Sequence, residues 1–85
     1  MRVRLLGYLG YVAGRDTLEL KDARSVREAL ESLSELGALR ELLYRKEGIL
    51  WEGVLLILNG RVVKSMEESV GEGSELVITL PTAGG

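Results

Sequence analysis

The last five residues, Pro81-Thr82-Ala83-Gly84-Gly85, are the segment of this sequence best suited to chemistry. Glycine has no Cβ, so a glycine backbone approaches reacting groups closely, and a terminal glycine can present its carboxylate inside a narrow pocket. A carboxylate is a poor electrophile, and attack on it requires activation, for example as an acyl-adenylate made from ATP. Five extended residues reach at most about 16–18 Å, which suffices to carry the Gly85 carbonyl into a deep channel of a partner.

The residues before Gly85 are suited to such a channel. Thr82, Ala83 and Gly84 have small side chains or none, so they need little width. Pro81 restricts the base of the segment and lowers the entropy lost on insertion. The alternative interpretation is a frayed terminus, which is common at the ends of domains. We expect residues 81–85 to form a flexible tail, held in the partner through Pro81 to Gly84, with the Gly85 carboxylate as its reactive group.

The residue types that are missing narrow the chemistry further. The chain has no cysteine and no histidine, which removes a thiol nucleophile and the commonest general base and metal ligand. We therefore expect a carrier or modifier protein rather than an enzyme, with no cofactor bound to this chain. The net charge of −2 argues against nucleic-acid binding.

An acidic cluster is the remaining candidate for binding. It consists of Glu67, Glu68, Glu72 and Glu75. These residues could attract a cation or a basic partner, but they lack the spacing of a metal-binding loop. We predict a solvated acidic loop and no metal site.

The beginning of the chain is polar, and no apolar run is long enough to span a membrane. We expect a cytoplasmic protein with no membrane partner.

The first half of the chain contains two expected strands and the clearest helix signal. Residues 2–9 and 17–21 alternate between apolar and polar residues, which predicts strands paired as a hairpin, with a loop over 10–14. Ser25 and Glu28 form a capping box. The apolar residues that follow recur at helical spacing as far as Leu36, and Gly37 follows as the expected C-cap.

The second half predicts a short helix and three more strands. The short helix covers 38 to about 46, and the apolar run 54–58 is an inner strand. Asn59-Gly60 is a strong hairpin turn that leads into a returning strand at 61–64. The last strand covers 75–80, where Pro81 ends it.

Together these elements predict an α+β domain over residues 1–80. The last strand buries its apolar residues only if it pairs with the first strand in the middle of the sheet, parallel to it. The result is the β-grasp arrangement of ubiquitin: a mixed four- to five-stranded sheet, one main helix and a short second helix. The predicted core consists of Leu5, Leu18, Val26, Leu30, Leu33, Leu56, Leu58, Ile78 and Leu80.

The helices can cover only one face of this sheet, whereas the run 54–58 offers apolar side chains to both faces. Leu6, Val62, Val77 and Thr79 are expected on the uncovered face. One interpretation is a patch that docks an activating enzyme. The other is ordinary scattered surface residues.

Four segments resemble those of known small ubiquitin-like proteins. They are Leu9 to Gly14 (LGYVAG), Leu58 to Arg61 (LNGR), Val70 to Leu76 (VGEGSEL) and Leu80 to Gly85 (LPTAGG). Over its whole length the chain resembles the small subunit of molybdopterin synthase (MoaD-type) and, equally, the small archaeal ubiquitin-like modifiers. It departs from them at Thr82, where a second proline is usual.

The resemblance implies how the tail reacts. An E1-like enzyme, which supplies ATP and Mg, would adenylate Gly85. A sulfur donor would then leave a thiocarboxylate for sulfur transfer within a synthase, beside its large subunit, or to tRNA. Alternatively, a lysine of a conjugation target would attack, giving an isopeptide bond. A third possibility is a non-covalent β-grasp interaction domain with an inert tail.

Overall fold

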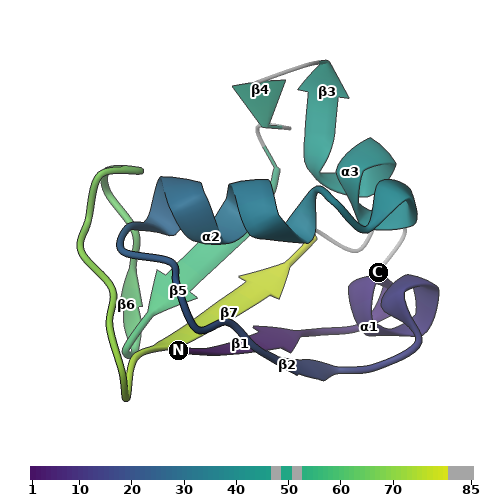
Figure 1. Ribbon diagram of the computed structural model, residues 1–85. Helices are drawn as coiled ribbons and strands as arrows, with labels where there is room; N and C mark the ends of the chain where they lie inside the picture. Colours follow the sequence, from purple (N-terminus) through teal and green to yellow (C-terminus); the bar gives the residue numbers. More distant parts are fainter. Residues whose placement is uncertain (47–48, 51–52, 81–85) are drawn as a thin grey trace.

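The computed structural model describes residues 1–46, 49–50 and 53–80, and Figure 1 shows the arrangement of their helices and strands. In chain order the elements are β1 (Arg2–Leu5), α1 (Tyr8–Ala13), β2 (Thr17–Glu19), α2 (Val26–Leu33), α3 (Gly37–Leu43), β3 (Tyr44–Lys46), β4 (Ile49–Leu50), β5 (Leu55–Leu58), β6 (Arg61–Val62) and β7 (Glu75–Thr79). The predicted α+β class is confirmed.

The main sheet has five strands in the order β2-β1-β7-β5-β6. β1 and β7 are parallel at its centre, with Leu5 paired to Ile78, as the sequence predicted. The predicted hairpin of β1 and β2 is also present. Asn59 and Gly60 form the turn between β5 and β6 with φ of 50° and 85°, the left-handed conformation that this dipeptide tolerates. The sheet is therefore a mixed β-grasp sheet whose last strand lies in the middle.

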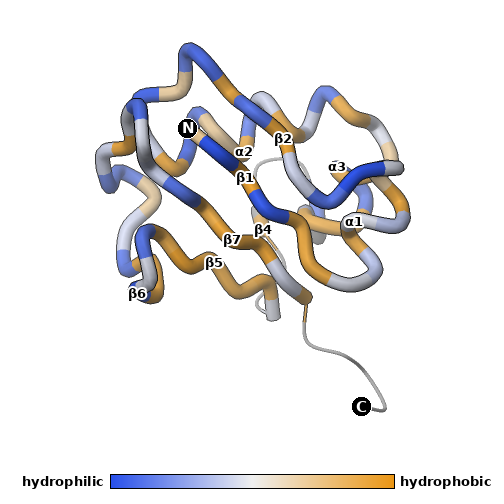
Figure 2. The backbone as a smooth tube through the Cα atoms, turned by 90° about the horizontal axis from the view of Figure 1, so that it is seen from below, coloured by the Kyte–Doolittle hydropathy of each residue, from blue (hydrophilic) through white to orange (hydrophobic). Residues whose placement is uncertain are grey.

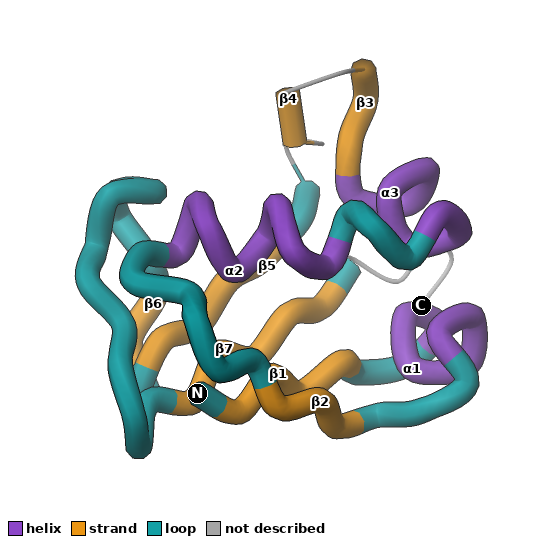
Figure 3. The backbone as a smooth tube through the Cα atoms, in the orientation of Figure 1, coloured by secondary structure: helices purple, strands orange, loops and turns teal. Residues whose placement is uncertain are grey.

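α2 crosses one face of the sheet, as Figure 3 shows. Its predicted capping box is present, because Ser25 Oγ accepts a hydrogen bond from the Glu28 N–H at 3.2 Å. The N–H groups of Val26 and Arg27 have no partner within the helix. They donate to the carbonyls of Glu68 and Met66, respectively. The loop before β7 thus satisfies the first turn of α2 and fixes the helix over the sheet.

The core lies between α2, α3 and the covered face of the sheet. Seven of the nine predicted core residues are buried. Leu18 and Leu80 are only half-buried. Leu18 belongs to the edge strand β2, and Leu80 follows the end of β7, so each lacks neighbours on one side. Leu9 of α1 and Leu39 and Leu43 of α3 were not among the nine predicted core residues, and they are fully buried as well.

The predicted loop over 10–14 is wrong, because the segment Tyr8–Ala13 is the helix α1 and β1 ends at Leu5 rather than at residue 9. Gly7 turns the chain with φ of 59°, and Gly14 closes the helix in the left-handed conformation with φ of 77°. The expected loop was inferred from Gly10 and Gly14. Gly10 instead lies inside α1, where its backbone packs against the carbonyl of Leu5.

The boundaries of the other helices also differ from the prediction. α2 ends at Leu33, and Gly37 begins α3 rather than capping α2. α3 ends at Leu43, and the chain continues into β3, which pairs with β4 in a separate two-stranded sheet. The prediction of two successive helices is confirmed, but the spacing of the leucines did not fix where the first helix ends and the second begins.

Candidate functional site: the uncovered sheet face and the end of β7

The predicted reactive residue Gly85 and the tail residues Pro81, Thr82, Ala83 and Gly84 lie outside the described residues. What the structure gives is the place from which they leave the domain. The Leu6 N–H donates to the Ile78 carbonyl at 3.0 Å, so β7 ends beside the exit of β1. The tail therefore starts from the central strand, where the sheet meets α1 (Figure 1).

The four residues predicted to dock a partner lie on one face. Residues that alternate with the buried ones along a strand point to the opposite face of the sheet. In register, Val62 pairs with Ile57, Ile57 with Val77, and Leu55 with Thr79. Leu6 follows β1 beside the end of β7. These six residues, Leu6, Leu55, Ile57, Val62, Val77 and Thr79, are called the apolar patch below.

The apolar patch is open to solvent over much of its area. Val62 is 58% exposed, Leu55 is 40% exposed and Leu6 is 39% exposed. Figure 2 looks at this side of the sheet, with hydrophobic residues running along β5 and β7 toward the start of the tail. Large exposed apolar side chains gathered on one face are typical of protein-interaction surfaces.

Leu55 and Ile57 were not among the predicted docking residues, although the apolar run 54–58 contained the signal. Leu56 and Leu58 are buried in the core, so their odd-numbered neighbours necessarily face the other side. A second surface feature was missed entirely, because its segment was interpreted as a loop. Tyr8 and Tyr11 of α1 are 61% and 82% exposed, and their rings stack with centroids 6.0 Å apart.

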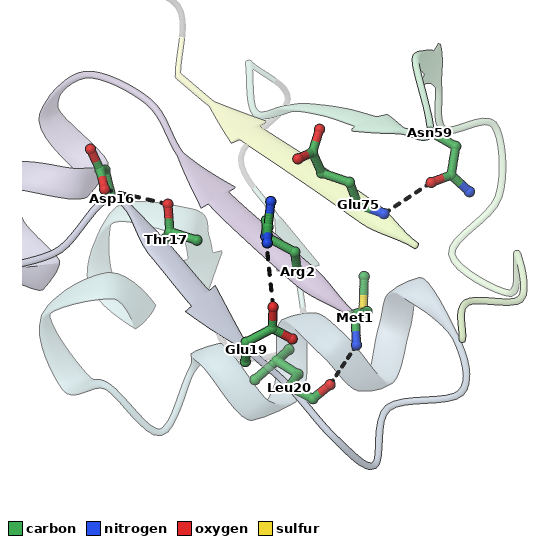
Figure 4. A network of polar contacts seen from close by, with 8 residues as sticks. All are labelled: Met1, Arg2, Asp16, Thr17, Glu19, Leu20, Asn59 and Glu75. Atoms are coloured by element: carbon green, nitrogen blue, oxygen red, sulfur yellow. Dashed lines mark hydrogen bonds and ion pairs between the residues drawn. The ribbon is translucent and has the colours of Figure 1, made fainter. Parts of the chain in front are cut away.

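The uncovered face becomes charged toward β2. Arg2 forms a cross-strand ion pair with Glu19, with 3.7 Å between Nε and Oε1 (Figure 4). Arg4 lies between Thr17 and Val77, at the border with the apolar patch. An apolar half and a charged half on one face are suited to a partner that is recognised both by burial and by charge.

Two side chains of the acidic cluster, those of Glu67 and Glu68, have a structural role in the described residues. Glu67 pairs with Arg27 of α2, with 2.6 Å between Oε2 and the guanidinium Nη2, and raises the pKa of Arg27 through a hydrogen bond and its charge. Glu68 Oε2 accepts hydrogen bonds from the backbone N–H groups of Lys64 and Ser65, which lower the pKa of Glu68. The Glu75 N–H donates to Asn59 Oδ1, so it ties β7 to the hairpin turn (Figure 4).

Within residues 1–46, 49–50 and 53–80, no group of three or more carboxylates is placed to hold a metal ion. Over the same part of the chain, none of the helices has the length and apolar composition needed to cross a membrane.

Several solved structures have the same fold. SAMP1 from Haloferax volcanii is 26% identical, with a TM-score of 0.85 over 99% of this chain and 97% of that chain. The small archaeal modifier protein 1 (SAMP1) from Methanosarcina acetivorans is 24% identical, with a TM-score of 0.86 over 99% and 94%. A chain in the complex of subunits 1 and 2 of molybdopterin-converting factor from Helicobacter pylori is 22% identical, with a TM-score of 0.65 over 99% and 96%.

No curated protein matches the chain by sequence. The solved structures thus include small archaeal modifier proteins and a chain from a complex of two protein subunits. The sequence model of the ThiS family matches residues 3–85, which is nearly the whole chain and includes the tail. The fold and this match show that the chain is a ubiquitin-like β-grasp protein that belongs to the ThiS family.

Proposed function

We propose that this protein carries sulfur as a thiocarboxylate on Gly85. The observation that carries the proposal is the origin of the tail, which leaves the central strand β7 at the rim of the apolar patch. A partner docked on the patch would have the tail directly within reach. The family match through residue 85 supports the same assignment.

The first step is activation of the Gly85 carboxylate. One carboxylate oxygen attacks the α-phosphorus of ATP at an E1-like enzyme, which also holds Mg; the acyl-adenylate forms and pyrophosphate leaves. This chain contributes the carboxylate and the slim tail, with Thr82 and Ala83 as its only side chains beyond Pro81. Glycine at the reacting position allows the close approach that the reaction needs.

In the second step a nucleophilic sulfur of a donor attacks the activated carbonyl and AMP leaves. With a persulfide as donor, this attack gives an acyl disulfide. A thiol then attacks the donor's inner sulfur, the S–S bond breaks, the donor and the thiol end as a disulfide, and Gly85 is left with a thiocarboxylate. The sulfur then passes to a small molecule, in the manner of a molybdopterin synthase whose large subunit performs the chemistry, or to tRNA. The absence of cysteine and histidine from the sequence agrees with a chain that presents a group for partners to act on.

A second function has its own support. The similarity to SAMP1 from Haloferax volcanii, at 26% identity over nearly the whole of both chains, favours a protein modifier. In that case the ε-amine of a target lysine attacks the same adenylate, loses a proton, and forms an isopeptide bond as AMP leaves. Both functions use the same tail and the same activating step, and they differ in the nucleophile.

Intact-mass analysis of the protein isolated from its host distinguishes these functions. A sulfur carrier gives a fraction heavier by the difference between sulfur and oxygen, and that fraction reacts with thiol-directed alkylating reagents. A modifier gives conjugates whose tryptic peptides carry residues 65–85 of this chain on a target lysine, because Lys64 is the last trypsin site in the sequence. A chain found only with an unmodified terminus, under conditions where the activating enzyme is present, would favour a non-covalent interaction domain.

A further inference from the structure

A groove of about 640 Å³ lies where β1 ends, between α1 and the beginning of β2. Its walls include Arg4, Leu6, Gly10, Tyr11 and Arg15. A Cβ at Gly10 would lie 2.9 Å from the Leu5 carbonyl oxygen, so a bare backbone forms this part of the wall. Leu6 belongs both to the groove and to the apolar patch, so the two surfaces are continuous and one partner can cover both.

The two arginines of β1 differ in how the sheet balances their charges. Both point to the uncovered face, because they alternate along the strand with buried residues. Arg2 lies in register with Glu19 on one side and with Glu75 on the other, and it forms the ion pair with Glu19. Arg4 lies in register with a threonine of β2 and a valine of β7. The charge of Arg4 therefore faces neutral side chains within the sheet, at the border with the apolar patch.

Inside the groove, positive charge exceeds negative charge among the side chains that the structure describes. Arg4 and Arg15 bring two guanidinium groups, and Asp16 brings one carboxylate. The Asp16 carboxylate accepts a hydrogen bond of 3.4 Å from the Thr17 hydroxyl, which also lines the groove. Two cations against one anion leave a net positive surface that attracts a carboxylate.

The acidic cluster lies at the other end of the sheet. Three of its residues precede β7 and Glu75 begins it, whereas the groove lies where β1 and β7 end. Figure 1 shows the loop before β7 and the helix α1 at opposite ends of the sheet. An acidic segment of a partner is therefore repelled at one end of the domain and attracted at the other, which orients the partner as it docks.

Tyr11 adds an aromatic side chain to the groove. It is 82% exposed, and its ring stacks on that of Tyr8 with centroids 6.0 Å apart. The stacking limits the positions of the ring, so less conformational entropy is lost when a partner packs against it. Tyrosine is enriched in protein interfaces because its ring buries apolar area while its hydroxyl stays in water. The groove thus offers apolar contact as well as positive charge, which favours a protein segment over a small inorganic anion.

We infer that the groove receives a carboxylate-bearing segment of the E1-like enzyme, and that Arg4 and Arg15 select this partner by its charge. In the complex, an aspartate or glutamate side chain of the enzyme lies against the two guanidinium groups, and the residues beside it contact Tyr11 and Leu6. The docking surface thus extends from the apolar patch, past the end of β1, onto α1. The inference rests on the proposed function only for the identity of the partner, and it involves no chemistry at the tail.

Binding of the full chain to the E1-like enzyme of the host, measured by surface plasmon resonance without ATP, tests this role of the groove. Arg4→Gln and Arg15→Gln should each lower the affinity roughly three- to tenfold, mainly through slower association. The loss should shrink when the salt concentration rises from about 0.05 M to about 0.5 M, because salt screens charges at the rim of an interface. Arg61→Gln is the matched control. It removes the same charge from β6, at the opposite edge of the sheet, and should leave the affinity nearly unchanged.

Two results would overturn the inference. One is that the wild type, Arg4→Gln and Arg15→Gln bind the enzyme with equal affinity. The other is a loss of affinity that is the same at low and at high salt, because the arginines would then act through packing and not through charge. Neither result bears on activation of the tail, because the assay omits ATP. A chain that binds through the groove but supports no ATP–pyrophosphate exchange would instead contradict the proposed function and leave this inference intact.

Discussion

The Leu6 N–H donates a hydrogen bond of 3.0 Å to the Ile78 carbonyl, and this bond joins the end of β1 to the end of β7. On one side of this bond, β1 leaves the sheet and leads into α1. On the other side β7 ends, and the tail begins two residues later. Because both strands are central in the sheet, the tail is anchored to the most buried part of the domain.

Leu30 tests the position of the main helix. Its side chain is fully buried under α2, so Leu30→Ala should lower the free energy of unfolding by roughly 2–5 kcal/mol. Leu36, which is 43% exposed, is the control, and Leu36→Ala should cost much less. Urea denaturation measures both variants. Equal losses would mean that the covered face of the helix is misplaced.

Glu68 predicts a specific dependence of stability on pH. The Lys64 N–H, and then the Ser65 N–H, bonds its carboxylate and holds its pKa below the usual 4.5 in the folded chain. A folded-state pKa below the unfolded one stabilises the fold above about pH 4.5, and this stabilisation is lost as pH falls through the folded pKa. Glu68→Gln should therefore lower Tm at pH 7, and the difference from the wild type should narrow in acid. Melting curves from neutral to acidic pH check this, and a difference that stays constant with pH would contradict the assignment.

The apolar patch is tested by placing a charge at its most exposed position. Val62→Glu should weaken binding to the E1-like enzyme by at least tenfold, or about 1.4 kcal/mol, because a carboxylate would be desolvated in the interface. Leu36→Glu, which adds the same charge at an exposed leucine of the α2–α3 connection, should leave the affinity unchanged. Calorimetry measures both. Equal affinities of the two variants would exclude the apolar patch as the interface.

Much of the fold could be predicted because the local signals and the burial pattern agreed. The Ser25–Glu28 capping box, the Asn59-Gly60 turn and the alternation in β7 each determine a local conformation that the tertiary structure keeps. The central position of β7 could be predicted because only a central strand buries Leu76 and Ile78. The apolar pattern of one short strand thus agreed with the arrangement of the whole sheet.

The predicted element boundaries failed at two glycines, because glycine occurs inside helices at close contacts as well as in loops and at helix ends. Gly10 inside α1 was interpreted as a loop residue, whereas the structure uses its missing Cβ for close contact with the Leu5 carbonyl. Gly37 was interpreted as a helix end, and it is a helix start. The exposed pair of Tyr8 and Tyr11 depends on α1, so it could not be predicted from an interpretation that lacked this helix.

A chain that stops at Gly84 tests whether Gly85 is the reactive end of the tail. Removing one residue withdraws the reacting carbonyl by about 3.5 Å, which exceeds the tolerance of an attack geometry near 3–3.5 Å. The Tm should stay nearly unchanged, because Gly85 has no side chain to bury and the buried core of the described residues lies within residues 1–78.

ATP–pyrophosphate exchange, measured with the E1-like enzyme of the host, compares the full chain with the chain that ends at Gly84. The proposed function predicts that exchange with the full chain is robust and that exchange with the shortened chain falls to the level of enzyme alone, at equal concentrations of folded protein. Equal exchange rates for the two chains would show that Gly85 is not the activated residue and would contradict the assignment of this protein as a carrier.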